Sequence, residues 1–558
     1  MDQPATDTRS RSANLARRLR ALSSGVCLSA VLGLGAAMMP VQGALLPAGG
    51  VTLAPATAQA QSFPAFRLAL AEGVAGDRGL AEFYRENGFE PVWTGAEHAA
   101  RRAALVSALS RAEEHGLPAA RYDLPGLLAA FEAVETERDR GFAEALASRA
   151  FYQYARDLSS GVLEPGTIIR QIVRDVPRPD ARALMHDFVA AEPISFMRNL
   201  APSSEEYLRL FNARRELEAT IASGGWGPRV PAGAVRPGQE GQPVVALRNR
   251  LIAMGYMPRT ATARYDASMQ RAVQLFQEAH ALEPNGIADN ATIQAINVEP
   301  QERLRSIIVA MERERWMPEE RGDRHILVNL MDFHTRVFDD GEEVFSTRSI
   351  IGQQGADRQT PEFSHAMTYI EINPDWTIPR SLLAGRWGAI AAGRYELIDA
   401  RGNRVSPFSV DLSRYTPRTL PFNVRQPPGP SNPLGEVKFM FPNPHAIYLH
   451  DTPERHLFRN TVRTHSAGCV RLNDPQELAY LLLARQFADP VTEYQRIRQS
   501  RQQTRVYLDT PVPIHLIYRT AFTTPDGRVH YRNDVYGRDA RLYDALRNAG
   551  APMRLASL

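Results

Sequence analysis

The chain changes its hydrophobic period near Pro300, and this change limits the architectures that it can adopt. Between residues 66 and 225, apolar residues recur at helical spacing, which predicts several amphipathic helices. After Pro300 the apolar residues fall in short runs separated by turn dipeptides such as Asp340-Gly341 and Asp526-Gly527, which is typical of strands and hairpins. A chain of 558 residues is also too long for a single core. The sequence therefore predicts a multidomain α+β protein.

The expected elements divide into two groups. The helices cover residues 71–87, 100–115, 123–136, 140–157, 200–222, 303–315 and 474–488. The strands cover residues 326–330, 336–339, 345–352, 368–372, 447–450, 505–508, 512–518 and 529–531. We expect a helical scaffold domain at 66–225 and a β-rich domain at 300–545. No catalytic set is evident in the helical part, which favours a role as scaffold or partner surface.

A stretch rich in Gly and Pro, residues 224–241, separates the helical part from a small module at 240–297. Three short helices are expected there, at 244–254, 267–280 and 291–297, with a turn at 285–289. The apolar residues expected to form their shared core are Leu247, Leu251, Val273 and Phe276.

An insertion between Pro374 and Pro433 interrupts the β-rich part. It is dense in Pro, Gly and Arg and has a weak period, so it is either a functional lid or a disordered loop. Its aromatic and charged edges favour a capping lid at 374–433.

The first 60 residues resemble an export signal. Five arginines precede an apolar stretch from about Val26 to Leu46, and small residues follow up to Ala58-Gln59-Ala60. This order is typical of a cleaved secretory peptide, and an uncleaved membrane anchor is the alternative. These arginines against two aspartates account for the formal net charge of +3, so the rest of the chain is neutral. A nucleic-acid partner therefore lacks electrostatic support.

Removing this leader would leave Cys469 as the sole cysteine, because Cys27 lies in the apolar stretch. An exported chain with one thiol has no internal disulfide. A buried inert cysteine is the simpler interpretation of a lone Cys. However, Cys469 follows a glycine in the polar segment Ser466-Ala467-Gly468, which predicts an accessible turn and favours a functional thiol.

His450, nineteen residues before Cys469, is the candidate base for this thiol. A thiol nucleophile needs a base, a group that orients the base, and N–H groups for the oxyanion. The turn at Ser466, Ala467 and Gly468 is expected to present those N–H groups. The orienting group is either a backbone carbonyl near Asp451 or the Asp451 carboxylate. Arg471 would lower the thiol pKa, bind a substrate carboxylate, or form a structural ion pair.

Several motifs together resemble one known family. They are Tyr448-Leu449-His450-Asp451-Thr452-Pro453, Ser466-x-Gly468-Cys469-Val470-Arg471-Leu472, Gln359-Thr360-Pro361, Asn373-Pro374-Asp375-Trp376, Pro433-Leu434-Gly435-Glu436-Val437-Lys438-Phe439, Phe441-Pro442-Asn443 and Asp534-Val535-Tyr536-Gly537-Arg538-Asp539. They resemble the L,D-transpeptidase catalytic domain with the YkuD or ErfK fold. The match extends to the larger branch with an N-terminal scaffold and a capping insertion. The module at 240–297 resembles the peptidoglycan-binding type 1 domain.

This resemblance implies a periplasmic enzyme of peptidoglycan synthesis. Cys469 would attack a tetrapeptide stem, form a thioester, and pass it to a second diaminopimelate as a 3→3 crosslink. An L,D-carboxypeptidase and a non-catalytic wall-binding scaffold are the alternatives. The resemblance implies no metal or organic cofactor, peptidoglycan stem peptides as substrate, carbapenem β-lactams as inhibitors, and cell-wall synthesis proteins as further partners.

The candidate substrate-binding residues are Arg471, Tyr448, Asp451, Trp376 and Lys438. Lys438 is the only lysine in the chain, where arginine otherwise supplies almost every cation. A specific role in the cleft and a solvated strand position are both open for it. The chain departs from many family members at Ala467, where they have histidine directly before Gly-Cys.

Overall fold

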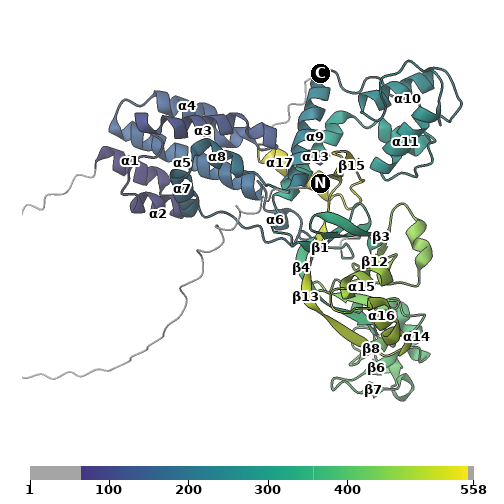
Figure 1. The fold of residues 1–558 in the computed structure, drawn as a ribbon. Helices are drawn as coiled ribbons and strands as arrows, with labels where there is room; N and C mark the ends of the chain where they lie inside the picture. The colour runs from purple at the N-terminus through teal and green to yellow at the C-terminus, as the bar shows by residue number, and fades with distance from the viewer. Residues whose placement is uncertain (1–63, 319, 356, 551–558) are drawn as a thin grey trace, which may run out of the picture. The chain divides into compact units, whose positions relative to one another are not determined.

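The computed structural model describes residues 64–318, 320–355 and 357–550, and Figure 1 shows their fold. The expected export signal lies outside these residues. No helix within the described ranges has the length and apolar character needed to cross a membrane. The expected domain limits stay predictions.

The first part of the described chain is helical. Its α-helices are α1 (Ala65–Val74), α2 (Arg78–Glu86), α3 (Ala99–Ser110), α4 (Leu124–Glu132), α5 (Glu137–Ser160), α6 (Pro165–Ile168), α7 (Ala181–Ala190), α8 (Pro193–Asn199) and α9 (Glu205–Ala222). The expected helix at 71–87 is two helices, because the Asp77 side chain accepts from the Leu80 N–H and starts α2. No helix was predicted at α7 and α8.

Three helices form the small module, as predicted. They are α10 (Gln242–Ala253), α11 (Ala267–Ala279) and α12 (Asn290–Ile296). Asp266 and Asp289 cap α11 and α12 by accepting backbone N–H groups. The four predicted core residues are all buried.

A nine-stranded sheet dominates the C-terminal part, in the order β11-β3-β12-β10-β9-β4-β13-β1-β2. The strands are β1 (Arg324–Asn329), β2 (His334–Asp339), β3 (Glu342–Gly352), β4 (Phe363–Ile372), β9 (Val437–Met440), β10 (Leu449–His450), β11 (Thr464–Ser466), β12 (Val470–Leu472) and β13 (Thr504–Ile517). An additional pairing joins β2, at one end of this order, to β3, which is next to the other end, so the sheet closes on itself. Two helices, α15 (Pro475–Leu483) and α16 (Pro490–Gln499), pack against it.

Two predicted strands, 505–508 and 512–518, are one strand, β13. Its register against β4 shifts between Tyr507 and Val512, which marks a bulge where Pro511 interrupts the sequence pattern. The expected helix at 474–488 ends at Leu483, and α16 follows it without having been predicted. The chain closes with a hairpin of β14 (Ala521–Thr523) and β15 (Val529–Tyr531) and with α17 (Arg538–Asn548).

The insertion at 374–433 is folded and has its own core. It contains β5 (Trp376–Thr377), α14 (Trp387–Ala391), β6 (Glu396–Ile398), β7 (Arg404–Val405) and β8 (Asn423–Gln426). The strands form a second sheet in the order β5-β8-β6-β7. Ile390 and Leu397 are fully buried between these elements, so the disordered-loop alternative is wrong.

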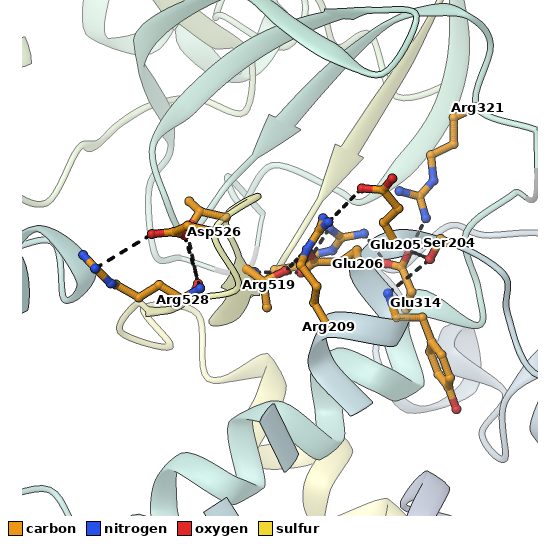
Figure 2. A network of polar contacts seen from close by, with 12 residues as sticks. Ser204, Glu205, Glu206, Arg209, Glu314, Arg321, Arg519, Asp526 and Arg528 are labelled. Carbon is orange, nitrogen blue, oxygen red and sulfur yellow. Dashed lines mark hydrogen bonds and ion pairs between the residues drawn. The ribbon is translucent and has the colours of Figure 1, made fainter. Parts of the chain in front are cut away.

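Helix α13 (Pro300–Glu314) carries buried charged residues that contact segments before and after it in the chain. Arg313 pairs with Glu362 at 2.5 Å and with Asp539 at 2.8 Å. Glu314 pairs with Arg519 and Arg321, and it accepts from the Ser204 hydroxyl at 2.7 Å, as Figure 2 shows. Burial alone would raise the pKa of Glu314, but the two arginines hold it at about 2. These pairs fix the C-terminal segments against α9 and α13.

Candidate active site

Strand pairing brings most of the candidate residues onto one face of the large sheet. β10 pairs in parallel with β12, so Leu449 lies beside Val470 and His450 beside Arg471. Leu449 and Val470 are fully buried in the core. Because side chains alternate along a strand, the other face carries Tyr448, His450, Cys469, Arg471 and Lys438, which is the antiparallel partner of His450.

His450 is held by the backbone of the next residue. It is only 4% exposed, and its Nδ1 lies 2.5 Å from the Asp451 carbonyl oxygen. A carbonyl only accepts, so Nδ1 carries the proton and Nε2 offers a lone pair. Burial, with help from the charge of Arg471, lowers the pKa of His450 to about 3. His450 is therefore a neutral imidazole in the form that a general base requires.

The Asp451 carboxylate has a different task. It accepts from the backbone N–H groups of Glu436 at 2.8 Å and Thr452 at 2.6 Å, and it pairs with Arg455. Gly435, at φ +61°, lies so close that a Cβ there would stand 2.2 Å from Asp451 Oδ2. Of the two orienting groups left open by the sequence, the carbonyl contacts the imidazole, and the carboxylate fixes the turn that carries this carbonyl.

The loop before Cys469 is bound tightly by side chains. Ser466 Oγ accepts from the Gly468 N–H at 3.1 Å and donates to the Cys469 carbonyl at 2.5 Å. Gly468 has φ +131°, which favours glycine. The Gly468 N–H is therefore occupied, which corrects the expectation that it faces an oxyanion. Ala467 is exposed, and the Cys469 N–H has no hydrogen bond within the part of the chain that the structure describes.

Thr360 also binds this loop, a role that was not predicted from the sequence. It is fully buried; its Oγ1 accepts from the Gly352 N–H at 2.9 Å and donates to the Gly468 carbonyl at 2.7 Å. Arg538 in turn donates to the Thr360 carbonyl at 2.8 Å. The Gln359-Thr360-Pro361 motif thus contacts both the cysteine loop and Arg538 of the C-terminal motif. These two motifs were the features of the sequence that could have indicated the role of Thr360.

Cys469 is a free, half-buried thiol whose Sγ lies 3.6 Å from the Ala446 carbonyl oxygen. Burial raises its pKa, against the opposing effects of hydrogen bonds from Tyr448 and the charges of Lys438 and Arg471. The resting site therefore holds a protonated thiol and a neutral imidazole, not a preformed ion pair. A nucleophilic role for this thiol would therefore require proton transfer during the attack.

Two cations flank the thiol in different ways. Arg471 donates to the Glu454 carboxylate at 2.5 Å, so the ion-pair interpretation of this residue holds in the structure. Lys438 Nζ lies 4.5 Å from the centre of the Tyr448 ring. It makes no hydrogen bond or ion pair with the described residues. Lys438 is therefore the cation of this face that has a charge to offer to a ligand.

Trp376 is placed away from this face. Its side chain is 6% exposed and packs in the core of the insertion, with the Arg386 guanidinium 4.7 Å from the ring centre. It supports the insertion and presents little surface to a substrate, unlike the expectation from sequence. Tyr448 packs against both the insertion core and the sheet core, so it links the insertion to the catalytic face.

Comparison with known proteins finds three domain models along the chain. Residues 323–514 match the model of the L,D-transpeptidase catalytic domain, YkuD. Residues 78–213 match a scaffold domain, and residues 240–296 match a domain described as "Putative peptidoglycan binding domain". The chain therefore contains an L,D-transpeptidase catalytic domain. It is preceded, in order, by a scaffold domain and a peptidoglycan-binding module, as the resemblance predicted.

One curated relative is the "Putative L,D-transpeptidase" of Haemophilus influenzae, which is 32% identical over 225 residues. The match covers 39% of this chain and 45% of the relative. An L,D-transpeptidase structure from Xylanimonas cellulosilytica is 14% identical, with 52% of this chain and all of that chain covered and a TM-score of 0.16. One from Stackebrandtia nassauensis is 13% identical, covers 52% and 97%, and has a TM-score of 0.21.

Proposed function

We propose that the protein is a cysteine L,D-transpeptidase that forms 3→3 crosslinks between peptidoglycan stem peptides. The observation that carries the proposal is the pairing of β10 with β12, which places the neutral imidazole of His450 on one strand and Cys469 directly before the neighbouring strand. The catalytic-domain match supports the reaction class, and the peptidoglycan-binding match supports the polymer. Both substrates lie outside the cytoplasm, in keeping with the predicted export signal.

The first half-reaction acylates Cys469. His450 Nε2 takes the thiol proton while sulfur bonds to the diaminopimelate carbonyl carbon of the diaminopimelate–D-Ala peptide bond in a tetrapeptide donor. The Cys469 N–H is the backbone donor available to the oxyanion. When the tetrahedral intermediate collapses, the C–N bond breaks, and the imidazolium returns its proton to the departing D-alanine amine. The product is a thioester on Cys469.

Lys438 is the candidate that recognises a substrate carboxylate near the thiol. Its cation has no carboxylate partner among the described residues, and it lies over the Tyr448 ring on the catalytic face. An ammonium group acts as a point charge and needs no bidentate geometry. This fits a position where the chain keeps its only lysine.

The second half-reaction transfers the acyl group. The side-chain amine of a second diaminopimelate loses a proton to His450 and attacks the thioester; the C–S bond breaks, and the thiol is reprotonated. If water attacks instead, the product is a tripeptide, and the protein is an L,D-carboxypeptidase. A non-catalytic scaffold is the remaining alternative. The ordered His450 and the unoccupied Cys469 N–H favour an active site over it.

The test is intact-mass analysis of the full chain with disaccharide-tetrapeptides. Wild type is expected to gain the mass of an acyl group, and 3→3 dimers are expected in the products. Cys469→Ser and His450→Gln should lose the adduct while keeping the wild-type unfolding midpoint. Tripeptides without dimers would select the carboxypeptidase. A folded wild-type protein that neither acylates nor changes the muropeptides would refute the proposal.

A further inference from the structure

A cavity lies apart from the cysteine site, at a place where three parts of the chain meet. Its volume is about 460 Å³, within the range of ligand pockets. The end of α9 and Trp226 form one side, the turn after α10 and His280 form another, and α13 with the β14–β15 turn closes it. None of its lining residues belongs to the catalytic face.

Aromatic rings line this cavity on several sides. Trp226, Tyr256, His280 and Tyr531 are all half-buried and contribute to its wall. His280 stacks on Tyr531, with ring centres 5.5 Å apart. The electron-rich face of an aromatic ring attracts the C–H groups of a ligand, so flat walls of this kind suit the face of a sugar ring.

Two arginines in the wall have charge to offer. Arg303 lies 4.6 Å from the Tyr531 ring centre and donates to the Ala295 carbonyl at 3.1 Å, but it has no ion pair with a described carboxylate. Arg528 lies 5.8 Å from the Tyr256 ring centre and meets Asp526 only at 3.8 Å. A half-buried guanidinium without a close carboxylate has lost part of its hydration, which an anionic ligand would replace.

His280 adds an acceptor to these donors. Its Nδ1 lies 2.8 Å from the Phe276 carbonyl, so Nδ1 carries the proton. Burial, and then the charge of Arg303, holds the pKa of His280 well below its usual value, so the ring is neutral. Nε2 is then free to accept from a hydroxyl or amide of a ligand.

The turn that closes the cavity is held in place at its base. Glu206 accepts from the Thr523 N–H at 2.9 Å and from its hydroxyl at 2.5 Å, and Arg209 donates to the same hydroxyl at 2.8 Å. Figure 2 shows Glu206 and Arg209 of this network and, in the same view, Asp526 and Arg528. The residue directly after β15 is fixed as well, because Arg532 donates to the Ala279 carbonyl of the small module at 3.0 Å. The cavity is therefore formed before any ligand binds.

We infer that this cavity binds an acidic glycopeptide of the wall polymer, an amino-sugar chain that bears a peptide with free carboxylates. A sugar ring would lie on the aromatic wall, and a peptide carboxylate would bind Arg303 and Arg528. The inference rests on the proposed function for the identity of the polymer. It adds that the binding site is composite, because Trp226, Arg303, Arg528 and Tyr531 lie outside the three-helix module.

The test measures binding and turnover separately, with the full chain. Sedimentation with purified sacculi and titration with a soluble disaccharide-tetrapeptide are compared for wild type, Arg528→Gln and the double variant Arg303→Gln/Arg528→Gln. Binding should weaken about tenfold for each lost guanidinium contact, while turnover of saturating soluble substrate stays at the wild-type level. Arg264→Gln is the matched control, since this exposed arginine of the module does not line the cavity. It should bind as wild type does.

Two further measurements keep the result decisive. Disaccharide-tetrapeptide should slow amide hydrogen exchange at residues 253–256 and 526–529 of wild type, a readout that needs no variant. It should also bind more tightly than either an uncharged amino-sugar oligomer or the free tetrapeptide. Unchanged binding in the double variant, or equal affinity for all three probes, would overturn the inference. If wild type binds the disaccharide-tetrapeptide but does not turn it over, that result would count against the proposed function alone.

Discussion

Replacing Thr360 with valine is expected to weaken the cysteine loop without changing any group that touches substrate. The buried hydroxyl accepts from the Gly352 N–H and donates to the Gly468 carbonyl, and valine has nearly the same shape but cannot do either. Each backbone group left unpaired costs about 1–3 kcal/mol. The free energy of unfolding should therefore fall by about 2–6 kcal/mol.

The effect on the reaction follows from the planarity of the peptide bond. The Gly468 carbonyl and the Cys469 N–H belong to one peptide unit, so anchoring the oxygen also fixes the direction of the N–H. Removing an oxyanion donor altogether costs about a hundred- to a thousandfold in rate. Loosening one should cost less, and we expect acylation of Cys469 to slow by about ten- to a hundredfold.

The assay is the rate of carbapenem acylation followed by intact mass, beside urea unfolding of the same samples. Thr360→Ser is the control, because it keeps the hydroxyl and loses only a methyl group. It should acylate within about threefold of wild type. If the valine variant acylates at the wild-type rate, or if serine and valine slow the reaction equally, the hydroxyl does not position the Cys469 N–H, and the reasoning fails.

Three further outcomes are expected. Gly435→Ala should slow acylation about tenfold in a folded protein, because its Cβ would displace the Asp451 carboxylate and shift the carbonyl that orients His450; a wild-type acylation rate would contradict this. Lys438→Met should raise KM for tetrapeptide substrate about tenfold with a smaller effect on kcat, and Lys438→Arg should restore part of it; equal KM values in steady-state assays would exclude carboxylate binding. His450 has a folded pKa of about 3 and an unfolded value near 6.5, so its stabilising effect is present above pH 6.5 and is lost as pH falls toward 3. Between pH 7 and pH 3.5, the free energy of unfolding measured in urea should therefore fall by about 4 kcal/mol more for wild type than for His450→Gln. The same pH dependence in both proteins would refute the lowered pKa of His450.

Much of the catalytic face could be predicted because its signals are local. Cys469, His450 and Arg471 lie in short motifs, and strand alternation alone places residues 448 and 450 on the same side. The orienting group of His450 could not be predicted. Both candidates belong to Asp451, and the choice depends on how Gly435 and the Glu436 N–H receive the carboxylate.

The contacts that escaped prediction join distant parts of the chain. Thr360 and Gly468 are 108 residues apart, and no periodicity reports a hydrogen bond of that range. The prediction for Trp376 was wrong for a related reason. Its motif suggested a residue of the cleft, whereas its side chain packs in the core of the insertion. The weak hydrophobic period of the insertion gave no sign of its four-stranded sheet. At β13 the sequence predicts two strands, 505–508 and 512–518, whereas the structure has one strand whose register against β4 shifts between Tyr507 and Val512.

The resting charge state of the site suits a lone thiol in the oxidising compartment that the predicted export signal implies. A thiolate is the species that oxidants attack, so a cysteine kept ionised by a charged histidine would be vulnerable in an oxidising compartment. Here burial raises the pKa of Cys469 and lowers that of His450, so both groups stay neutral until a substrate carbonyl is in place. The arrangement therefore ties reactivity to substrate binding, and peroxide should oxidise Cys469 of the free protein more slowly than an unperturbed thiol at the same pH.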